Sequence, residues 1–201
     1  MSPALSKGDQ TRDRLIQLGA GLARVDGLEG LTIGNLASAA GMSKSGVFAH
    51  FGSREDLQLC ILDAASQAFS DLVFRPALRE RRGLPRLKAI ARNWLEFLRG
   101  MGSDEGGCIM MAAASEYDDR PGPVRDRVQT MQRRLRSELE RAVQMAIDAG
   151  DLRADSDAAQ FAFELYALVL GTHHDLRLFG SEAAAPRAER AFEALLKRHL
   201  P

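Results

Sequence analysis

Residues 31–58 read LTIGNLASAAGMSKSGVFAHFGSREDLQ, and this stretch decides the fold. Thr32 suits the N-cap of a short helix, because apolar residues follow it at steps of three and four. They are Ile33, Leu36, Ala37 and Ala40. Gly41 ends this helix. Ser43 can cap a second helix that runs to about His50, where Gly52 then breaks the chain.

The spacing within this stretch indicates two short helices that cross. Such a crossing needs a small residue at the contact and a turn residue that accepts a positive φ. Ala37 and Gly41 meet these needs, and Val47 returns from the second helix into the shared core. Counted from Ile33, alanine is fifth, glycine ninth and valine fifteenth, which is typical of helix-turn-helix proteins.

The rest of the chain also shows helical periodicity. A first helix is predicted from near Thr11 to Gly27 and Gly30, and a fourth follows Ser53. Later helices are expected at 87–101, 108–116, 123–150, 155–179 and 184–200. No sustained period-2 alternation appears. The prediction is an all-α fold of about nine helices, with a three-helix helix-turn-helix domain at residues 1–52 and a larger helical domain at 53–201.

Composition narrows the functional classes. The 27 basic and 27 acidic residues cancel, so the chain lacks the net positive field of a non-specific nucleic-acid binder. Residues 1–54 hold two more basic than acidic side chains, so any DNA binding has to be local. No apolar run approaches the roughly 20 residues of a membrane span, and no leader pattern is seen. Cys60 and Cys108 do not form a disulfide framework, which fits a reducing cytoplasm.

The quoted stretch, extended to residues 11–68, resembles the DNA-binding signature of the tetracycline-repressor (TetR) family, which pairs TxxxLAxxAGxS with GxxYxHFxxKexL. The resemblance implies a DNA-binding transcription regulator. It further implies a repressor that a small molecule releases from a palindromic operator. Two positions depart from the signature. Ala49 stands where many members carry a second aromatic residue that touches phosphate, and Arg54 replaces the usual lysine.

The second helix of the motif carries the expected DNA contacts. Its exposed positions are predicted to include Lys44, Ser45, Gly46 and His50, whereas Val47, Phe48 and Phe51 are predicted to point inward. Lysine can donate to guanine edges, and helix N-termini attract phosphate. The resemblance implies backbone contacts from Thr32, Lys44, His50 and Arg54 and base contacts from residues Ser43 to Gly46. Thr32 and Ser43 can also be read as helix caps alone.

The resemblance assigns ligand sensing and dimerisation to residues 53–201. The last two helices are expected to form an intermolecular four-helix bundle, and the helix at 155–179 is expected to be buried on all sides. A pocket for an unknown small-molecule inducer would be mostly apolar with a few polar groups. Aromatic and methionine residues at helical spacing more often belong to the core than to a pocket. With that alternative open, the candidate residues are Trp94, Phe97, Met101, Met110, Met111, Tyr117, Phe161, Phe163, Tyr166 and His173.

No enzymatic, cofactor or metal function is predicted. Neither a Ser-His-Asp arrangement nor a phosphate-binding or dinucleotide-binding glycine motif appears. His173 and His174 are neighbours on a helix and point about 100° apart, which disfavours a shared metal. Two alternatives stay open: an all-helical enzyme with an incidental helix-turn-helix, and a helical scaffold or adaptor that has lost DNA binding. A missing aromatic side chain at Ala49 supports the second of these.

Overall fold

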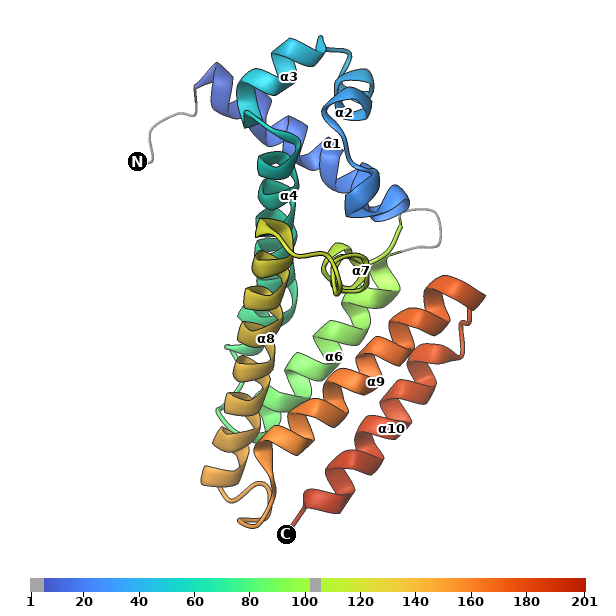
Figure 1. Cartoon of the computed structure of the whole chain (residues 1–201). Helices are drawn as coiled ribbons and strands as arrows, with labels where there is room; N and C mark the ends of the chain where they lie inside the picture. The colour runs from blue at the N-terminus through green and yellow to red at the C-terminus, as the bar shows by residue number, and fades with distance from the viewer. Residues whose placement is uncertain (1–5, 102–105) are drawn as a thin grey trace. The chain divides into compact units, whose positions relative to one another are not determined.

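The computed structural model describes residues 6–101 and 106–201, and within them it contains helices and no strand (Figure 1). The helices are α1 (Lys7–Gly30), α2 (Ile33–Ala40), α3 (Lys44–Phe51), α4 (Arg54–Phe69), the π-helical segment η1 (Ser70–Phe74), α5 (Arg75–Ala77), α6 (Leu84–Gly100), α7 (Ile109–Glu116), α8 (Pro123–Asp148), α9 (Ala158–Phe179) and α10 (Ala184–His199). Counting Arg54–Ala77 as one continuous helix gives nine helices in these described ranges. The predicted all-α fold with an N-terminal helix-turn-helix is confirmed.

Backbone contacts divide the described residues into two compact units. The N-terminal unit comprises the described residues up to Gln67 together with Cys108–Gln129, and the C-terminal unit comprises those of Ala68–Gly107 and Thr130–Pro201. Residues 108–129 thus group with the helix-turn-helix in space, which the sequence does not suggest. The functional boundary between residues 52 and 53 stays a prediction.

Local signals define the helix-turn-helix. The Thr32 hydroxyl accepts from the backbone N–H of Asn35 at 3.1 Å, and the Asn35 side chain accepts from the Thr32 N–H at 2.8 Å. Gly41 ends α2 in the left-handed region with φ 65°. The Ser43 hydroxyl then accepts from the Gly46 N–H at 3.1 Å and starts α3. The three caps and stops predicted at these positions are confirmed.

One core holds the N-terminal unit together. Its fully buried side chains come from α1 to α4 and from the link between α1 and α2. They include Leu15, Leu28, Leu31, Leu36, Val47, Leu57 and Ile61. Burying a leucine or isoleucine side chain is worth roughly 1.5–3 kcal/mol, so these residues fix how α3 packs on the helices behind it. Val47 is one of the α3 residues that the sequence pattern expects in this core, and it is fully buried there.

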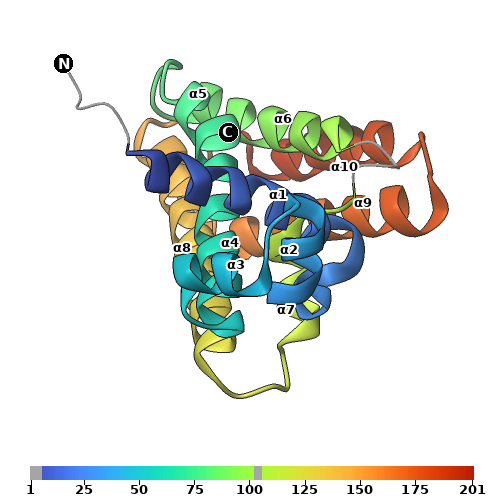
Figure 2. The same ribbon diagram turned by 90° about the horizontal axis from the view of Figure 1, so that it is seen from above.

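In the C-terminal unit, α9 packs along α10 and along α6 (Figures 1 and 2). Trp94 of α6, Phe161 and Leu165 of α9 and Leu195 of α10 are each at most 2% exposed. The expectation that α9 is buried on all sides is wrong, since Phe163 is 60% and Leu170 42% exposed. Within one chain only one face of this helix is covered, because α6 and α10 both pack on the side that carries Phe161 and Leu165.

The helix Arg54–Ala77 contains a π-helical turn. The N–H of Arg75 bonds to the carbonyl of Ser70, five residues back, and the Asn93 side chain donates to the carbonyl of Val73 at 3.0 Å. By length and composition alone this 24-residue helix could cross a membrane. This helix is weak evidence for a membrane span, because its residues Leu57 and Ile61 are fully buried in the protein core.

Candidate nucleic-acid interface and ligand site

Helix α3 presents one face to the core and another to solvent. Val47 is fully buried and Phe51 is 7% exposed, so these two residues, four apart, form the inner stripe. Lys44, Ser45 and Ala49 lie on the exposed side. The prediction that Phe48 points inward is wrong, since its side chain is 53% exposed. Phe48 lies about 100° around the helix from Val47, and two turns of helix bury a single stripe.

Phe48 gives the exposed face an apolar component. With Ile33, Lys44, Ser45 and Ala49 it lines a shallow depression of about 370 Å³. Phenylalanine can contact the methyl group of thymine in a major groove, and lysine can donate to guanine or to phosphate. The depression therefore combines an apolar surface with a positive charge, and sequence reasoning missed its largest side chain. A plot of α3 around its axis would have separated Phe48 from the Val47 stripe.

Lys44 is the exposed cation of α3. Its ammonium has no hydrogen-bond or ion-pair partner in the parts of the chain that the structure describes, residues 6–101 and 106–201. Ser43 and Ser45 lie beside it, with their hydroxyl oxygens 3.1 Å apart. A Cβ on Gly46 would lie 3.2 Å from the Ser43 hydroxyl oxygen, so the glycine keeps this corner of the helix open. These four predicted site residues share one surface.

Thr32 and Ser43 cap α2 and α3, so their structural role is observed. A hydroxyl that accepts from a backbone N–H still has its own hydrogen to donate. His50 is half-buried at the end of α3, with its ring 6.5 Å from that of Phe51. The caps therefore do not exclude the phosphate contacts expected of Thr32 and Ser43.

Arg54 differs from Lys44 because its guanidinium is already engaged. Its Nε donates to the carbonyl of Leu31 at 2.9 Å, a terminal nitrogen donates to the carbonyl of Glu29, and the Glu29 carboxylate lies 3.3 Å away. Arg54 thus ties the start of α4 to the end of α1. A lysine ammonium has no planar fork to make these bonds together, which gives the arginine at this position a structural reason.

A hydrogen-bond network connects α7 to the end of α1. The Tyr117 hydroxyl donates to Glu29 at 2.8 Å and accepts from the Gln58 amide at 3.1 Å. The Glu116 carboxylate accepts from the backbone N–H groups of Leu28 and Glu29 at 3.3 and 2.8 Å. Burial first, and then the hydrogen bond to Glu29, raise the pKa of Tyr117. The same bond holds the pKa of Glu29 below its ordinary value.

The candidate ligand residues do not form one group. Met110, Met111 and Tyr117 belong to the N-terminal unit, and the other seven belong to the C-terminal unit. Phe161 packs on His199 with ring centroids 5.1 Å apart, whereas Phe163 faces outward. Met101 ends α6, and burial lowers the pKa of the half-buried His173.

Three of the candidates do meet in the C-terminal unit. The Trp94 ring lies 5.3 Å from Phe69 and 6.2 Å from Tyr166, and Phe97 lies 5.4 Å from Phe69. Phe69, which the sequence did not single out, is the centre of this aromatic cluster. The buried indole N–H of Trp94 has no hydrogen-bond partner among the described residues. Nor do those residues contain a group of three or more His, Cys, Asp or Glu side chains that could hold a metal.

Comparison with known structures gives close matches over nearly the whole chain. A TetR transcriptional regulator from Chloroflexus aurantiacus is 26% identical, with a TM-score of 0.83 over 98% of this chain and 100% of the other. A TetR-family regulator from Cytophaga hutchinsonii is 21% identical, with a TM-score of 0.80 over 98% of each chain. AibR, solved with isovaleryl coenzyme A and operator DNA, is 20% identical, with a TM-score of 0.72 over 95% and 98%. Curated protein sequences give no significant match.

Family models cover both parts of the sequence. Residues 15–59 match the model of bacterial regulatory proteins of the tetR family, and residues 83–192 match a tetracyclin repressor-like C-terminal domain. The first match contains the exposed helix α3, and the second covers more than half of the chain. The protein therefore belongs to the TetR family of DNA-binding transcriptional regulators.

Proposed function

We propose that this protein is a homodimeric transcription repressor that binds a palindromic operator in the cytoplasm and leaves it when a small molecule binds. One observation carries the DNA-binding part: α3 exposes Lys44, Ser45 and Phe48 while Val47 and Phe51 hold it to the core. In a helix-turn-helix protein the recognition helix lies in the major groove and its N-terminal residues contact base edges.

The proposed contacts follow from the side chains on this face. Lys44 donates to a guanine edge or a phosphate, and Phe48 contacts a thymine methyl group. Ser43, Ser45 and the backbone at Gly46 approach the bases. Thr32, His50 and the remaining N–H groups of Arg54 contact phosphate, which positions the helix without reading sequence.

The exposed face of α9 supports the proposed homodimer. Four large apolar side chains on this helix are between 42% and 68% exposed: Phe163, Leu170, Leu178 and Phe179. Ala167 and Gly171 lie between them and are also exposed, so another helix could approach closely. Exposed apolar surface of this kind usually marks an interface. A two-fold dimer would place two copies of α3 on two half-sites, which makes the operator a palindrome.

The aromatic cluster supports a ligand site in the C-terminal unit. The buried N–H of Trp94, which finds no acceptor among the residues that the structure describes, is a donor that a ligand acceptor would satisfy. Phe97 and Tyr166 would contact the apolar part of such a ligand. AibR, which shares the fold, was solved with both a ligand and operator DNA. A ligand releases DNA only if it binds the released state more tightly than the bound state.

Selection from a random duplex library tests the DNA-binding part. Purified full-length protein is expected to enrich duplexes with a two-fold symmetric sequence, whose affinity falls steeply with salt because phosphate contacts release counterions. If no sequence is enriched and the protein shows no salt-dependent binding to duplex DNA, the result would support the helical scaffold instead.

Trp94, the single tryptophan of the chain, reports on the ligand part. Compounds from a small-molecule library that release the protein from the selected duplex are expected to change the intensity or wavelength of its emission. Release by compounds that leave the emission of Trp94 unchanged would place the ligand away from the aromatic cluster and overturn this assignment.

A further inference from the structure

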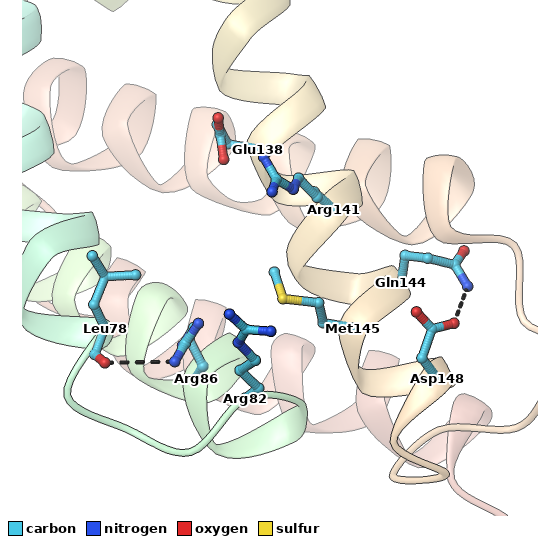
Figure 3. A pocket seen from close by; sticks show the side chains of 8 residues that line it. All are labelled: Leu78, Arg82, Arg86, Glu138, Arg141, Gln144, Met145 and Asp148. Atoms are coloured by element: carbon cyan, nitrogen blue, oxygen red, sulfur yellow. Dashed lines mark hydrogen bonds between the residues drawn. The ribbon is translucent and has the colours of Figure 1, made fainter.

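The C-terminal unit has a second feature that DNA binding does not use, a cavity of about 520 Å³ (Figure 3). One wall is the segment from Leu78 to the first turn of α6, which contributes Arg82 and Arg86. The other wall is α8, which contributes Glu138, Arg141 and Met145. None of the aromatic cluster lines it.

Its three arginines have unused donors. Arg82 and Arg141 have no hydrogen-bond or ion-pair partner within residues 6–101 and 106–201. Arg86 donates from one terminal nitrogen to the carbonyls of Glu80 and Leu78 at 3.0 and 3.5 Å. Its Nε is buried and has no partner in the same described ranges. A buried N–H without an acceptor is unfavourable, so the cavity has more donors than the chain satisfies.

Acidic side chains only partly balance these charges. Asp148 accepts from the Gln144 amide at 2.8 Å, as Figure 3 shows, and is thereby turned to its own helix. Glu138 lies one turn before Arg141 on α8. Three guanidinium groups against two carboxylates leave the lining with one excess positive charge.

The wall that carries Arg82 is held in place. The Asp151 carboxylate accepts from the Leu84 N–H at 2.9 Å and from Arg81 at 3.1 Å, and these bonds lower its pKa. Gly83 has φ 99°, and a Cβ there would lie 2.2 Å from an Asp151 carboxylate oxygen. A wall fixed in advance loses little conformational entropy when a ligand binds.

We propose that this cavity binds a small organic anion. Its carboxylate or phosphoryl head would lie among Arg82, Arg86 and Arg141, because guanidinium groups match the geometry of these oxyanions. Its apolar part would lie on Leu78 and Met145. The volume is that of an ordinary small-molecule site. The site is independent of the proposed DNA contacts, so either proposal can fail alone.

Calorimetric titration of the full chain tests the site without DNA. Hexyl phosphate and hexanoate are the probes for the two head groups, with 1-hexanol and inorganic phosphate as controls. At least one probe is expected to bind more tightly than inorganic phosphate, whereas 1-hexanol lacks the charge and is expected not to bind. Equal heats for the probes and 1-hexanol, or none at all, would overturn the proposal.

Substitutions of opposite sign locate the binding. Arg141→Gln is expected to weaken the probe about tenfold, since it removes a charge-assisted hydrogen bond. Glu138→Gln removes a repelling charge and is expected to strengthen binding severalfold. Arg133→Gln, at an exposed arginine of α8 outside the cavity lining, is the matched control. Unchanged affinity in Arg141→Gln, or weaker binding in Glu138→Gln, would contradict the assignment, with melting curves confirming that each variant is folded.

Discussion

Among the candidate DNA-contact residues, Lys44 is the one whose replacement is expected to change DNA binding without changing stability. Because its ammonium bonds to nothing in the described residues, Lys44→Ala is expected to leave the melting temperature unchanged. We expect it to weaken binding to the selected duplex about tenfold. The slope of the logarithm of the affinity against the logarithm of the salt concentration is expected to become smaller by about one. Fluorescence anisotropy at several salt concentrations measures both.

Lys197→Ala is the matched control, because Lys197 is an exposed lysine in the C-terminal unit. It is expected to retain the affinity and the salt slope of the unmodified protein. Equal losses in the two variants would mean that Lys44 acts only through net charge.

Gly27 is a residue whose replacement acts on the fold. It has φ 77° and ψ 166°, a region that side chains avoid, and a Cβ would lie 2.4 Å from the Glu116 carboxylate. Gly27→Ala is therefore expected to lower the free energy of unfolding by about 1–3 kcal/mol, which urea denaturation measures. Gly21→Ala, on the same helix with open space around its Cβ, is expected to raise stability by up to about 1 kcal/mol. The idea fails if both alanines have the same effect.

Among the elements, α7 is fixed to the end of α1 by a bond that depends on pH. Tyr117 has a folded-state pKa above its ordinary value of 10.0, because burial and the bond to Glu29 favour the neutral phenol. The stability that this bond contributes is complete below pH 10.0 and is lost as pH rises above it. Melting temperatures should therefore fall more steeply above about pH 10 in the unmodified protein than in Tyr117→Phe.

At neutral pH the Tyr117→Phe variant is expected to be less stable by about 1 kcal/mol, the value of a typical hydrogen bond. Parallel alkaline slopes in the two proteins would show that Tyr117 titrates without consequence for folding. The pH dependence has the opposite sign at Glu29, whose pKa is held below its ordinary value of 4.5. The stability that its ionised carboxylate contributes is complete above pH 4.5 and is lost as pH falls below it.

Much of the element structure could be predicted because its causes are local. The caps at Thr32 and Ser43 and the stop at Gly41 each depend on residues within four positions. Other features depend on distant contacts. Glu116 meets Leu28 across 88 positions of sequence, and the aromatic cluster depends on Phe69. Helical periodicity shows that such residues are apolar or capping without showing which helix they meet.

At the scale of the whole molecule, the exposed face of α9 governs assembly. Leu170→Glu would place a charge in an apolar interface, which is costly, whereas Leu170 is 42% exposed and its replacement spares the core. Light scattering after size-exclusion chromatography is expected to show twice the 22.0 kDa chain mass for the unmodified protein and the single chain mass for this variant. Affinity for the selected palindrome is expected to fall about a hundredfold with it.

Leu72→Glu is the control for the assembly experiment, because Leu72 is a 58% exposed leucine of η1 outside the last two helices. It is expected to keep the double mass. A Leu170→Glu variant that also keeps it would move the dimer contact away from α9.

The π-helical turn Ser70–Phe74 also constrains how long this part of the chain can be. Such a turn accommodates one more residue than an α-helix needs over the same distance. We therefore expect that a related sequence can lose a single residue here and still form one continuous helix. The free carbonyl of Val73, which now accepts from the Asn93 side chain, would then no longer be available. In an alignment, a one-residue gap at this point would be expected to coincide with replacement of the asparagine.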